Sequence, residues 1–412
     1  MRAAKKATRM VAVAGALATL LTACSVSAAG RSADDRTTPS TPIAAASASE
    51  RSPNPAPRTP PTTSASAQPG AKPPRGRGHL RAGSQPAALP GDVLIADKAN
   101  NRLLVVDRHG RIRWRFPRPG DLRRGQSFRG PDDAFFSPDG RYIIATEEDD
   151  DVISVIDVAH HRIVYRYGVP GRPGVGPNRL DSPDDALLLP DGYILTADIK
   201  NCRLLLIGPH SHRPTRTFGT TTNLCYHHPP RRYGSPNGAF PMNNGRYLVT
   251  EINGDWVDAI DLSGHVYWST HPPGIAYPSD SNQIGRDRFL TVDYSTPGQV
   301  LIFNRAGRAL WRYRPNGPQA LDHPSLALPL PNGDILLNDD YNNRVIVVDP
   351  HTRHIVWQYG YTGVPGAAPG YLDNPDGVDL VPPHSLLARH ADTMGEPAPA
   401  RQPTTRRHRG SR

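Results

Sequence analysis

Short apolar segments separated by turn residues recur through residues 89–383. Residues 102–107, 152–157 and 344–349 are examples of these segments, and Pro-Asp-Gly or Pro-Asn-Gly triplets separate many of them. Segments of this length bounded by Gly, Pro, Asn and Asp are typical of β-strands joined by tight turns. No apolar period of 3.6 residues is sustained anywhere in this region. The pattern therefore predicts an all-β domain and excludes an α-helical solenoid.

The strands are organised in repeats that each begin at a proline followed by small or acidic residues. Successive prolines are 52, 53, 42, 46 and 51 residues apart, and they are Pro131, Pro183, Pro236, Pro278, Pro324 and Pro375. A first strand follows the proline, then a turn, a second strand, a third strand, and a fourth strand that ends in an aromatic pair. Six units of four strands predict a six-bladed β-propeller.

The first blade is divided between the two ends of the domain. Residues 374–382 read as the missing first strand of the unit that begins at residues 89–97. We therefore predict that strands from the N- and C-terminal ends of the domain complete this blade and close the ring. Four of the five tryptophans occupy one position of the repeat, where a large ring can fill the wedge between blades: Trp114, Trp268, Trp311 and Trp357.

The N-terminal segment carries targeting information. Four basic residues within residues 1–9 precede an apolar stretch at 10–21 that is too short to span a bilayer, and the sequence Leu-Thr-Ala-Cys ends at Cys24. This resembles a bacterial lipobox. We expect residues 1–24 to be a lipoprotein signal peptide and Cys24 to be lipidated, which would anchor the protein to the outer face of the cytoplasmic membrane. The alternative is an ordinary signal peptide cut near Ala28 or Ala29, with Cys24 lost.

The segments that flank the domain lack core material. Residues 25–88 are rich in Pro, Ser and Ala, and residues 384–412 are short of large apolar side chains, so both are expected to be disordered. The formal net charge of +10 comes from residues 1–24, 25–88 and 384–412, which contribute +4, +5 and +4. Residues 89–383 are therefore left at about −3, and the basic composition gives no support for nucleic-acid binding.

Acidic residues recur at one position of every repeat, fifteen or sixteen residues after the proline. This acidic column consists of Asp97, Glu147, Asp198, Glu251, Asp293 and Asp339. The first strand of a blade begins, and the second ends, at the same face of the ring. We therefore expect a carboxylate-rich mouth at that face, to which the residues around the repeat prolines contribute: Asp132, Asp133, Asp184, Asp185, Asn237, Asp280, His323 and Asp376.

Two interpretations of these acids remain open. Oxygen-rich sites suit a hard cation, with Ca²⁺ the one candidate cofactor, or a cationic ligand. Alternatively, an acid that ends a strand caps the next turn or pairs with a nearby arginine, as Asp97 could with Arg102. Recurrence in all six units favours this structural role for the column. The sequence assigns no catalytic residue and no set of metal ligands.

The two cysteines of the domain, Cys202 and Cys225, are 23 residues apart, one on a third strand and one in the loop that follows that blade. In an exported protein this arrangement predicts a disulfide. A metal site formed by Cys225, His227 and His228 is the competing interpretation. These histidines and His323 interrupt the repeat and could act as ligands or acid–base groups. An exposed structural role is favoured for them.

Two segments carry a family resemblance. The spacing of Asp97 and Arg102 around Asn100-Asn101, and of Asp339 and Arg344 around Asn342-Asn343, resembles NHL-type propeller repeats. One unit also resembles the quinoprotein repeat through Asp349, Thr352 and Trp357, although Arg353 stands where that family favours glycine. In such families these residues serve blade docking. The resemblance thus implies the propeller fold and says little about activity.

Together these features predict a cell-surface binding module whose partner is a wall polymer or a surface protein and not a nucleic acid.

 A monomer held at the membrane by its lipid anchor is the expected state. The alternative is a propeller enzyme, either a metal-dependent hydrolase or lyase at the acidic mouth or, with less support, a quinone-dependent dehydrogenase. The dehydrogenase is disfavoured because such enzymes resemble larger, eight-bladed rings.

Overall fold

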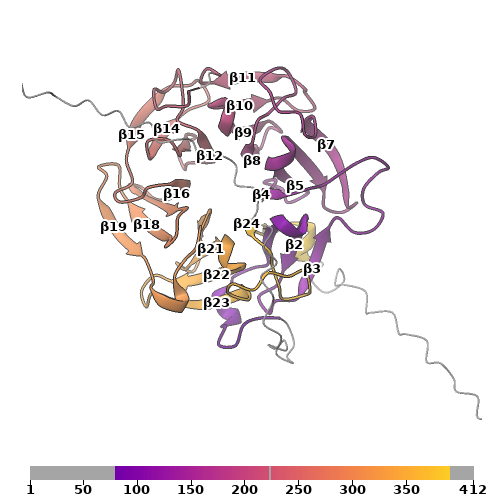
Figure 1. Cartoon of the computed structure of the whole chain (residues 1–412), viewed down its shortest axis with the longest axis vertical. Helices are drawn as coiled ribbons and strands as arrows, with labels where there is room; N and C mark the ends of the chain where they lie inside the picture. Colours follow the sequence, from indigo (N-terminus) through magenta and orange to yellow (C-terminus); the bar gives the residue numbers. More distant parts are fainter. Residues whose placement is uncertain (1–78, 222–223, 390–412) are drawn as a thin grey trace, which may run out of the picture. The chain divides into compact units, whose positions relative to one another are not determined.

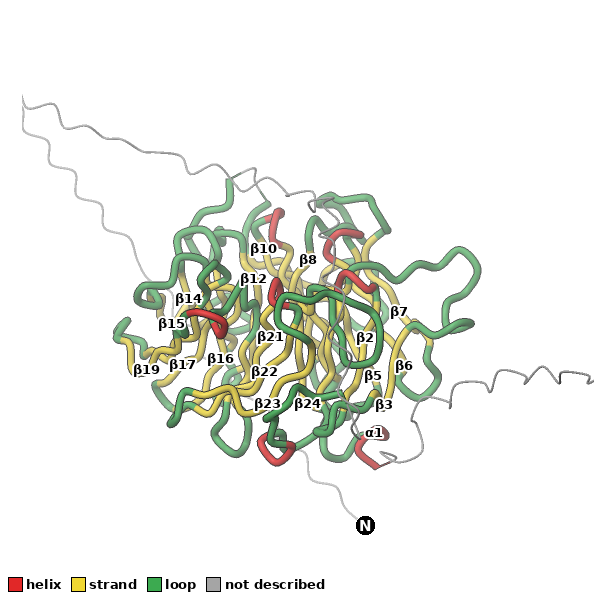
Figure 2. Tube along the Cα trace, turned by 60° about the horizontal axis from the view of Figure 1, so that its bottom comes forward, coloured by secondary structure: helices red, strands yellow, loops and turns green. Residues whose placement is uncertain are grey.

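The computed structural model describes residues 79–221 and 224–389, and its strands form six antiparallel sheets of four strands each. The sheets are arranged around a common centre, with the first strand of each blade innermost and the fourth outermost (Figure 1). Figure 2 shows the strands running between two faces covered by loops. The predicted all-β, six-bladed propeller is confirmed.

The first three blades contain the strands nearest the N-terminal end of the domain. The first blade consists of β24 (Pro375–Leu380), β1 (Val93–Asp97), β2 (Arg102–Val106) and β3 (Ile112–Phe116). The second consists of β4 (Pro131–Phe136), β5 (Tyr142–Glu147), β6 (Val152–Asp157) and β7 (Arg162–Gly168). The third consists of β8 (Pro183–Leu188), β9 (Ile194–Asp198), β10 (Arg203–Ile207) and β11 (Pro214–Phe218).

The other three blades follow the same order of strands. The fourth consists of β12 (Pro236–Pro241), β13 (Tyr247–Glu251), β14 (Trp256–Ile260) and β15 (Val266–Thr270). The fifth consists of β16 (Pro278–Gly285), β17 (Arg288–Asp293), β18 (Gln299–Phe303) and β19 (Ala309–Tyr313). The sixth consists of β20 (Ala327–Pro329), β21 (Ile335–Asp339), β22 (Arg344–Asp349) and β23 (His354–Gly360).

Helical segments of the described residues are short. Single 3₁₀ turns are η1 (Pro86–Ala88), η2 (Lys98–Asn100), η3 (Glu148–Asp150), η4 (Ile199–Asn201), η5 (Gly317–Gln319) and η6 (Asp340–Asn342), and the one α-helix is α1 (Leu386–Arg389). Within the described part of the chain, no helix is long and apolar enough to cross a membrane.

The ring is closed where the two ends of the domain meet. β24 pairs with β1 in antiparallel register, with Val93 opposite Leu380 and Ile95 opposite Val378. The innermost strands also contact their neighbours all the way round, including β24 with β4 and β20 with β24. The predicted closure by strands from both ends is confirmed, and it leaves every blade fully paired.

Tight turns join the first and second strands, as the glycine-containing triplets predict. Gly140 follows Pro138-Asp139, adopts φ +67°, and donates its N–H to the Ser137 carbonyl at 2.8 Å. A side chain at this φ would be strained, which explains the glycine. The turns set the register that points alternate apolar residues toward the neighbouring blades.

The repeated tryptophans join neighbouring blades. Trp114 and Trp357 are buried, and Trp311 is partly buried. The indole N–H groups of these three donate to backbone carbonyls of the next blade: Trp114 to Val158 at 3.1 Å, Trp311 to Pro350 at 3.0 Å, and Trp357 to Arg108 at 3.0 Å. Each ring therefore fills a wedge and also satisfies its polar group across it. The ring of the fourth, Trp268, lies 5.0 Å from that of Phe289.

Ordered structure extends beyond the predicted limits of the domain. Residues 79–88, which we assigned to the tether, contact the sixth blade: Leu80 bridges to Tyr359, and the Gln85 N–H donates to the Val356 carbonyl at 2.7 Å. At the other end, the buried Leu387 of α1 packs against the core. A few apolar side chains thus hold segments whose average composition predicts disorder. The predicted signal peptide, Cys24, most of the tether and residues 390–412 lie outside the described residues.

Candidate functional site

The acidic column forms a set of buried hydrogen-bond acceptors at the ends of the second strands. All six acids are buried. Each accepts a backbone N–H from the residue two positions before the repeat proline of its own blade, namely Asp373, Arg129, Asp181, Gly234, Ala276 and Asp322. The column therefore fixes the loop that leads into each first strand.

In the first, third and sixth blades the column acid also binds the Asn and Arg that follow it. Asp97 accepts hydrogen bonds from Asn100 Nδ2 at 2.9 Å and Arg102 Nε at 2.6 Å. Asp198 accepts the corresponding bonds from Asn201 and Arg203, as Asp339 does from Asn342 and Arg344. Burial raises the pKa of Asp198 to about 6 although Arg203 opposes the rise. The hydrogen-bond donors for these acids therefore come from the turn that follows each of them.

The second and fifth blades use other donors for the same purpose. Glu147 accepts hydrogen bonds from Ser154 at 2.6 Å and Arg166 at 3.0 Å. Asp293 accepts one from Gln299 Nε2 at 2.7 Å, and Arg312 in turn contacts Gln299. Arginine thus supports the column in five blades.

A second group of acids lies where the first strands begin, close to the centre of the ring. We call Asp132, Asp133, Asp184, Asp185 and Asp280 the axial carboxylate cluster, and all five side chains are buried. They come from β4, β8 and β16, at the first or second position after the repeat proline. The strands that carry these residues begin at one face of the ring, which we call the mouth face.

Two glycines at the second position after the repeat proline make room for the cluster. A Cβ on Gly238 would collide with Asp185 Oδ2 and lie 2.5 Å from Asp280 Oδ1. A Cβ on Gly377 would lie 2.5 Å from Asp133 Oδ1. Carboxylates from the third and fifth blades consequently meet beside the glycine of the fourth.

The cluster oxygens are close enough to share a cation. One oxygen each from Asp133, Asp185 and Asp280 lie within 4.8 Å of one another, and the same is true of Asp132, Asp133 and Asp184. Ca²⁺ binds oxygens at about 2.3–2.6 Å, so ligands on opposite sides of the ion lie up to about 5 Å apart. Asp133 belongs to both groups and links them.

The inner members of the cluster lack basic partners. No Lys, Arg or His of the described residues forms an ion pair with Asp133, Asp184, Asp185 or Asp280. Both oxygens of Asp185 and Oδ1 of Asp133 are buried without a hydrogen-bond donor from the described N–H and hydroxyl groups. Burial raises the pKa of Asp185 well above its usual value, and the Asp280 and Asp133 carboxyls add to the rise. Burial likewise raises the pKa of Asp280 to about 7.

Lys98 neutralises the outer edge of the cluster. Its Nζ contacts Asp132 and lies 3.1 Å from both Asp376 Oδ2 and Glu148 Oε2. Burial alone would raise the pKa of Asp376, but the Lys98 ammonium holds it at about 2. One lysine thus serves Asp132 and Asp376 and leaves the inner carboxylates unpaired.

An aromatic group borders the cluster at the mouth face. The Tyr294 ring centroid lies 5.4 Å from that of Tyr277 and 4.9 Å from that of His323, and His323 lies 4.3 Å from Tyr341. His323 Nδ1 also lies 2.7 Å from Asp322 Oδ1. Tyr341 is 51% exposed. We call Tyr277, Tyr294, His323 and Tyr341 the aromatic rim.

Two further residues predicted at the mouth, Asn237 and Asp376, lie next to the cluster. Asn237 Nδ2 donates to Ser279 Oγ at 3.1 Å and opposes the rise in the pKa of Asp280 that burial causes, and Asp376 pairs with Lys98. Sequence reasoning missed Lys98 and the three tyrosines of the rim. The available signal was the residue after the column acid, which changes chemically from blade to blade, as Lys98 and Tyr294 illustrate.

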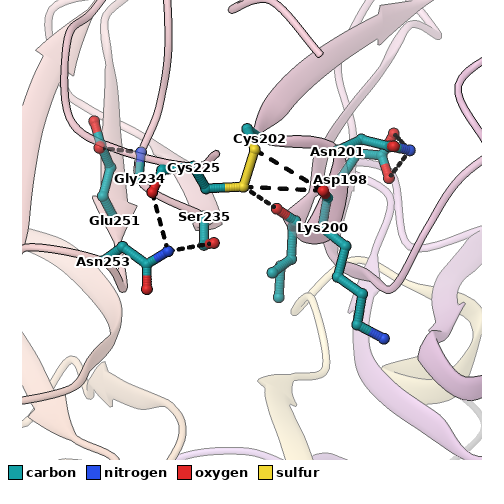
Figure 3. Close-up of a disulfide and its surroundings, with 10 residues drawn as sticks. Asp198, Lys200, Asn201, Cys202, Cys225, Gly234, Ser235, Glu251 and Asn253 are labelled. Carbon is teal, nitrogen blue, oxygen red and sulfur yellow. Dashed lines mark hydrogen bonds between the residues drawn. A yellow bond between two sulfur atoms is a disulfide. The ribbon is translucent and has the colours of Figure 1, made fainter. Parts of the chain in front are cut away.

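The loop that interrupts the repeat is tied to the third blade. Cys202 and Cys225 form the predicted disulfide, with a Cα–Cα distance of 5.0 Å (Figure 3). The competing interpretation, a metal site that uses the Cys225 thiolate, is therefore wrong, because the sulfur is bonded to Cys202. His228 is exposed, whereas His227 is partly buried with Nδ1 3.1 Å from Glu251 Oε1.

Comparisons with known proteins add only distant matches. No protein-family model and no curated protein matches this chain. Solved structures that resemble it include a protein of unknown function from Bacteroides caccae, with 14% identity over 70% of this chain and 98% of the other and a TM-score of 0.48. A chain of a nidogen–laminin complex matches with 14% identity over 71% and 99% of the two chains and a TM-score of 0.47. Virginiamycin B lyase from Staphylococcus aureus matches with 15% identity over 60% and 73% and a TM-score of 0.42.

At these identities and scores, the matches carry no argument about function. The fold rests on the strand topology, which defines a six-bladed propeller. Resemblance to NHL-type or quinoprotein-type repeats remains a prediction.

Proposed function

We propose that this chain is an exported binding module that holds a hard divalent cation such as Ca²⁺ at the axial carboxylate cluster and binds its ligand at the mouth face. The observation that carries the proposal is Asp185, whose two buried oxygens have no hydrogen-bond donor among the described N–H and hydroxyl groups. An isolated buried carboxylate is costly, so it must take up a proton or a cation.

A cation explains the arrangement better than a set of protons does. Five carboxylates converge, and two glycines leave space for them. Ca²⁺ accepts six to eight oxygens from carboxylates, carbonyls and water at distances that these groups span. Mg²⁺ demands a tighter octahedron and retains more water, so this cluster favours Ca²⁺ over Mg²⁺.

The aromatic rim supports a binding role for the same face. Tyr294, His323 and Tyr341 combine apolar ring faces with polar atoms, and Tyr341 is largely exposed. Such side chains are frequent in binding surfaces because they bury large areas at little entropic cost. A wall polymer or a surface protein is the ligand class that an exported module would meet.

The experiment is a Ca²⁺ titration of the purified, metal-stripped protein by calorimetry and thermal unfolding. At a hundred times the dissociation constant, the cation should stabilise the protein by about 2.7 kcal/mol and raise Tm by several degrees. Asp185→Asn should abolish both effects. Asp191→Asn is the matched control, because Asp191 is an exposed turn residue of the same blade. An equal Tm shift in the Asp185→Asn protein would refute the proposal.

Membrane attachment has a separate test. Cys24 is the residue that the proposed lipobox would lipidate, so the wild-type chain should fractionate with membranes in a bacterial host. Cys24→Ser should move it to the soluble exported fraction without changing Ca²⁺ binding. Equal fractionation of the two proteins would contradict the anchor and leave the proposed cation site standing.

A second candidate function is a metal-dependent hydrolase or lyase at the mouth face. The observation that favours it is the contact of His323 Nδ1 with Asp322 Oδ1, beside the Tyr294 ring. A carboxylate that orients a histidine is an arrangement suited to general base catalysis. Turnover of a substrate that His323→Ala abolishes, with Ca²⁺ affinity unchanged, would establish this function over simple binding.

A further inference from the structure

The fourth blade departs from the arrangement that supports the acidic column elsewhere. Glu251 is the column acid of this blade, and no Lys or Arg of the described residues pairs with it. In the second blade, Ser154 lies opposite Arg166, and both contact Glu147. The corresponding pair in the fourth blade is Asp258 opposite Ser269. A second acid therefore stands next to Glu251, and the arginine is absent.

A histidine from the loop completes this group. His227 Nδ1 lies 3.1 Å from Glu251 Oε1 and 3.7 Å from Asp258 Oδ2. One ligand atom from each of the three residues lies within 4.8 Å of the other two. Both carboxylate side chains are fully buried, whereas His227 is 19% exposed. Ser269 lies near Asp258, but neither Asp258 oxygen has a hydrogen bond of good geometry from the described donors.

These separations suit a small, four-coordinate metal ion. Zn²⁺ binds histidine nitrogen and carboxylate oxygen at about 2.0–2.2 Å, which places the ligand atoms of a tetrahedral site about 3.3–3.5 Å apart. The observed 3.1 and 3.7 Å bracket that value. One nitrogen and two carboxylates also form a ligand set that borderline metal ions accept, unlike the all-oxygen axial cluster.

The surrounding structure fixes the three side chains. The second Glu251 oxygen accepts the Gly234 N–H, and Asn253 Nδ2 donates to the Cys225 carbonyl at 3.2 Å and to Ser235 Oγ at 3.0 Å (Figure 3). The Cys202–Cys225 disulfide therefore anchors the start of the loop two residues before His227. Such supporting contacts orient ligands before a metal binds.

The histidine ring is also held by stacking. The His227 ring lies 4.0 Å from that of Trp256 with an interplanar angle of 11°, and the His271 ring lies 3.6 Å from the same indole at a tilt of 38°. Trp256 thus restrains the ring that would donate the nitrogen. It also provides a spectroscopic reporter, because a metal ion on His227 would change the environment of the indole.

We propose that His227, Glu251 and Asp258 form a binding site for Zn²⁺ or a similar divalent transition metal, with a fourth position open to water beside the partly exposed histidine. The site is separate from the axial carboxylate cluster and does not depend on the proposed function. An ordinary ion pair, in which His227 replaces the missing arginine, is the competing explanation.

The experiment is a Zn²⁺ titration of the purified, metal-stripped, full-length protein with its disulfide intact, followed by calorimetry and tryptophan fluorescence. One equivalent should bind and alter the fluorescence. His227→Ala and Asp258→Asn should each weaken binding at least tenfold. Trp256→Phe should remove the fluorescence change but retain calorimetric binding. Each variant is compared by thermal unfolding in metal-free buffer to confirm that it folds.

Two controls separate this site from other metal binding. His228→Ala removes an exposed neighbouring histidine and should leave Zn²⁺ affinity unchanged, as should Asp185→Asn in the axial cluster. Zn²⁺ binding that His227→Ala does not weaken would overturn the proposal. A wild-type protein that does not bind Zn²⁺ would also overturn it. If His227→Ala then destabilises the protein, the three residues form an ion pair and not a metal site.

Discussion

The acidic column and the axial carboxylate cluster are built from the same kind of side chain at the same face of the ring, but their surroundings differ. Asp339 in the column is fully buried and receives hydrogen bonds from Arg344, Asn342 and a backbone N–H. Asp185 in the cluster is buried to nearly the same degree, and its nearest charged neighbours are other carboxylates. Burial therefore does not distinguish a structural acid from a candidate ligand. The supply of donors does.

The fourth blade lies between these two cases. Glu251 keeps the backbone N–H that every column acid accepts, but a histidine and a second acid replace its arginine. A repeat protein thus shows its candidate sites where the repeat changes. The first and last predictions below test whether the donors, and not burial itself, separate the column from the cluster.

The largest effect is expected from removing an arginine of the column. Arg344→Met leaves Asp339 buried without its charged partner, which should cost about 3–5 kcal/mol of unfolding free energy. Chemical denaturation measures the loss. The double variant Arg344→Met/Asp339→Asn should recover part of it. Arg111→Ala removes an exposed partner of Asp107 and should cost less than about 1 kcal/mol. Equal losses of unfolding free energy in Arg344→Met and Arg111→Ala would contradict the claim that the column acids depend on their buried donors.

The next effect concerns the disulfide that joins a column turn of the third blade to the loop of the fourth. Cys202 adopts φ +56°, the left-handed conformation of Asn101 and Asn343 in equivalent turns. Cys202→Asn/Cys225→Ser should therefore keep the turn and lose only the cross-link. A closed loop of this length contributes about 3 kcal/mol in the chain-entropy model. Urea denaturation should show the same loss of unfolding free energy in the variant and in the chemically reduced wild type. A variant as stable as the oxidised wild type would contradict this prediction.

Both the fold and the acidic column can be predicted from patterns in the sequence. The spacing of the repeat prolines gives six units, and residues 374–382 complete the first blade. The Asp-x-x-Asn-x-Arg pattern of Asp198, Asn201 and Arg203 places three hydrogen-bonding groups within one turn, so its local geometry can be inferred from spacing alone. The disulfide was predicted from the expected export of the chain and from the spacing of the two cysteines, and it is confirmed.

The candidate sites are only partly visible in the sequence. Asp185 and Asp280 are recognisable as acids, but their meeting across Gly238 depends on the ring geometry. The group of His227, Glu251 and Asp258 depends on strand register and on the path of a loop, neither of which spacing specifies. Local patterns therefore indicated Arg102 and Arg344 as partners of Asp97 and Asp339, whereas contacts between distant segments required the folded chain.

A pH-dependent effect of intermediate size is expected from Asp379 on the first strand of the first blade. Burial raises its pKa to about 7, although the Phe136 and Leu380 N–H groups oppose the rise. Because the folded pKa exceeds the unfolded value, the stability contribution is complete below about pH 4 and is lost as pH rises through 7. The total should be about 2 kcal/mol after allowance for partial exposure.

Thermal unfolding from pH 4 to pH 8 measures the Asp379 contribution. Asp379→Asn should flatten the fall of Tm with pH, and the turn variant Asp191→Asn controls for loss of a single acid. A wild-type profile that Asp379→Asn leaves unchanged would show that this carboxyl has the same affinity for protons in the folded and unfolded chains.

The smallest effect is expected from Asp280→Asn, and it tests the difference between column and cluster most directly. The change in stability that this substitution causes should be of opposite sign with and without Ca²⁺. In chelator, Asp280→Asn removes one of several crowded carboxyls and should stabilise the protein by about 1 kcal/mol. In saturating Ca²⁺ the same variant has one ligand fewer, so it should be less stable than wild type. Asp339→Asn in the column should destabilise the protein in both buffers, because Arg344 loses its partner either way. Thermal unfolding of both variants with Ca²⁺ and with chelator distinguishes the two patterns. Destabilisation by Asp280→Asn in both buffers, as expected for Asp339→Asn, would show that the cluster is a structural network with hydrogen-bond donors of its own.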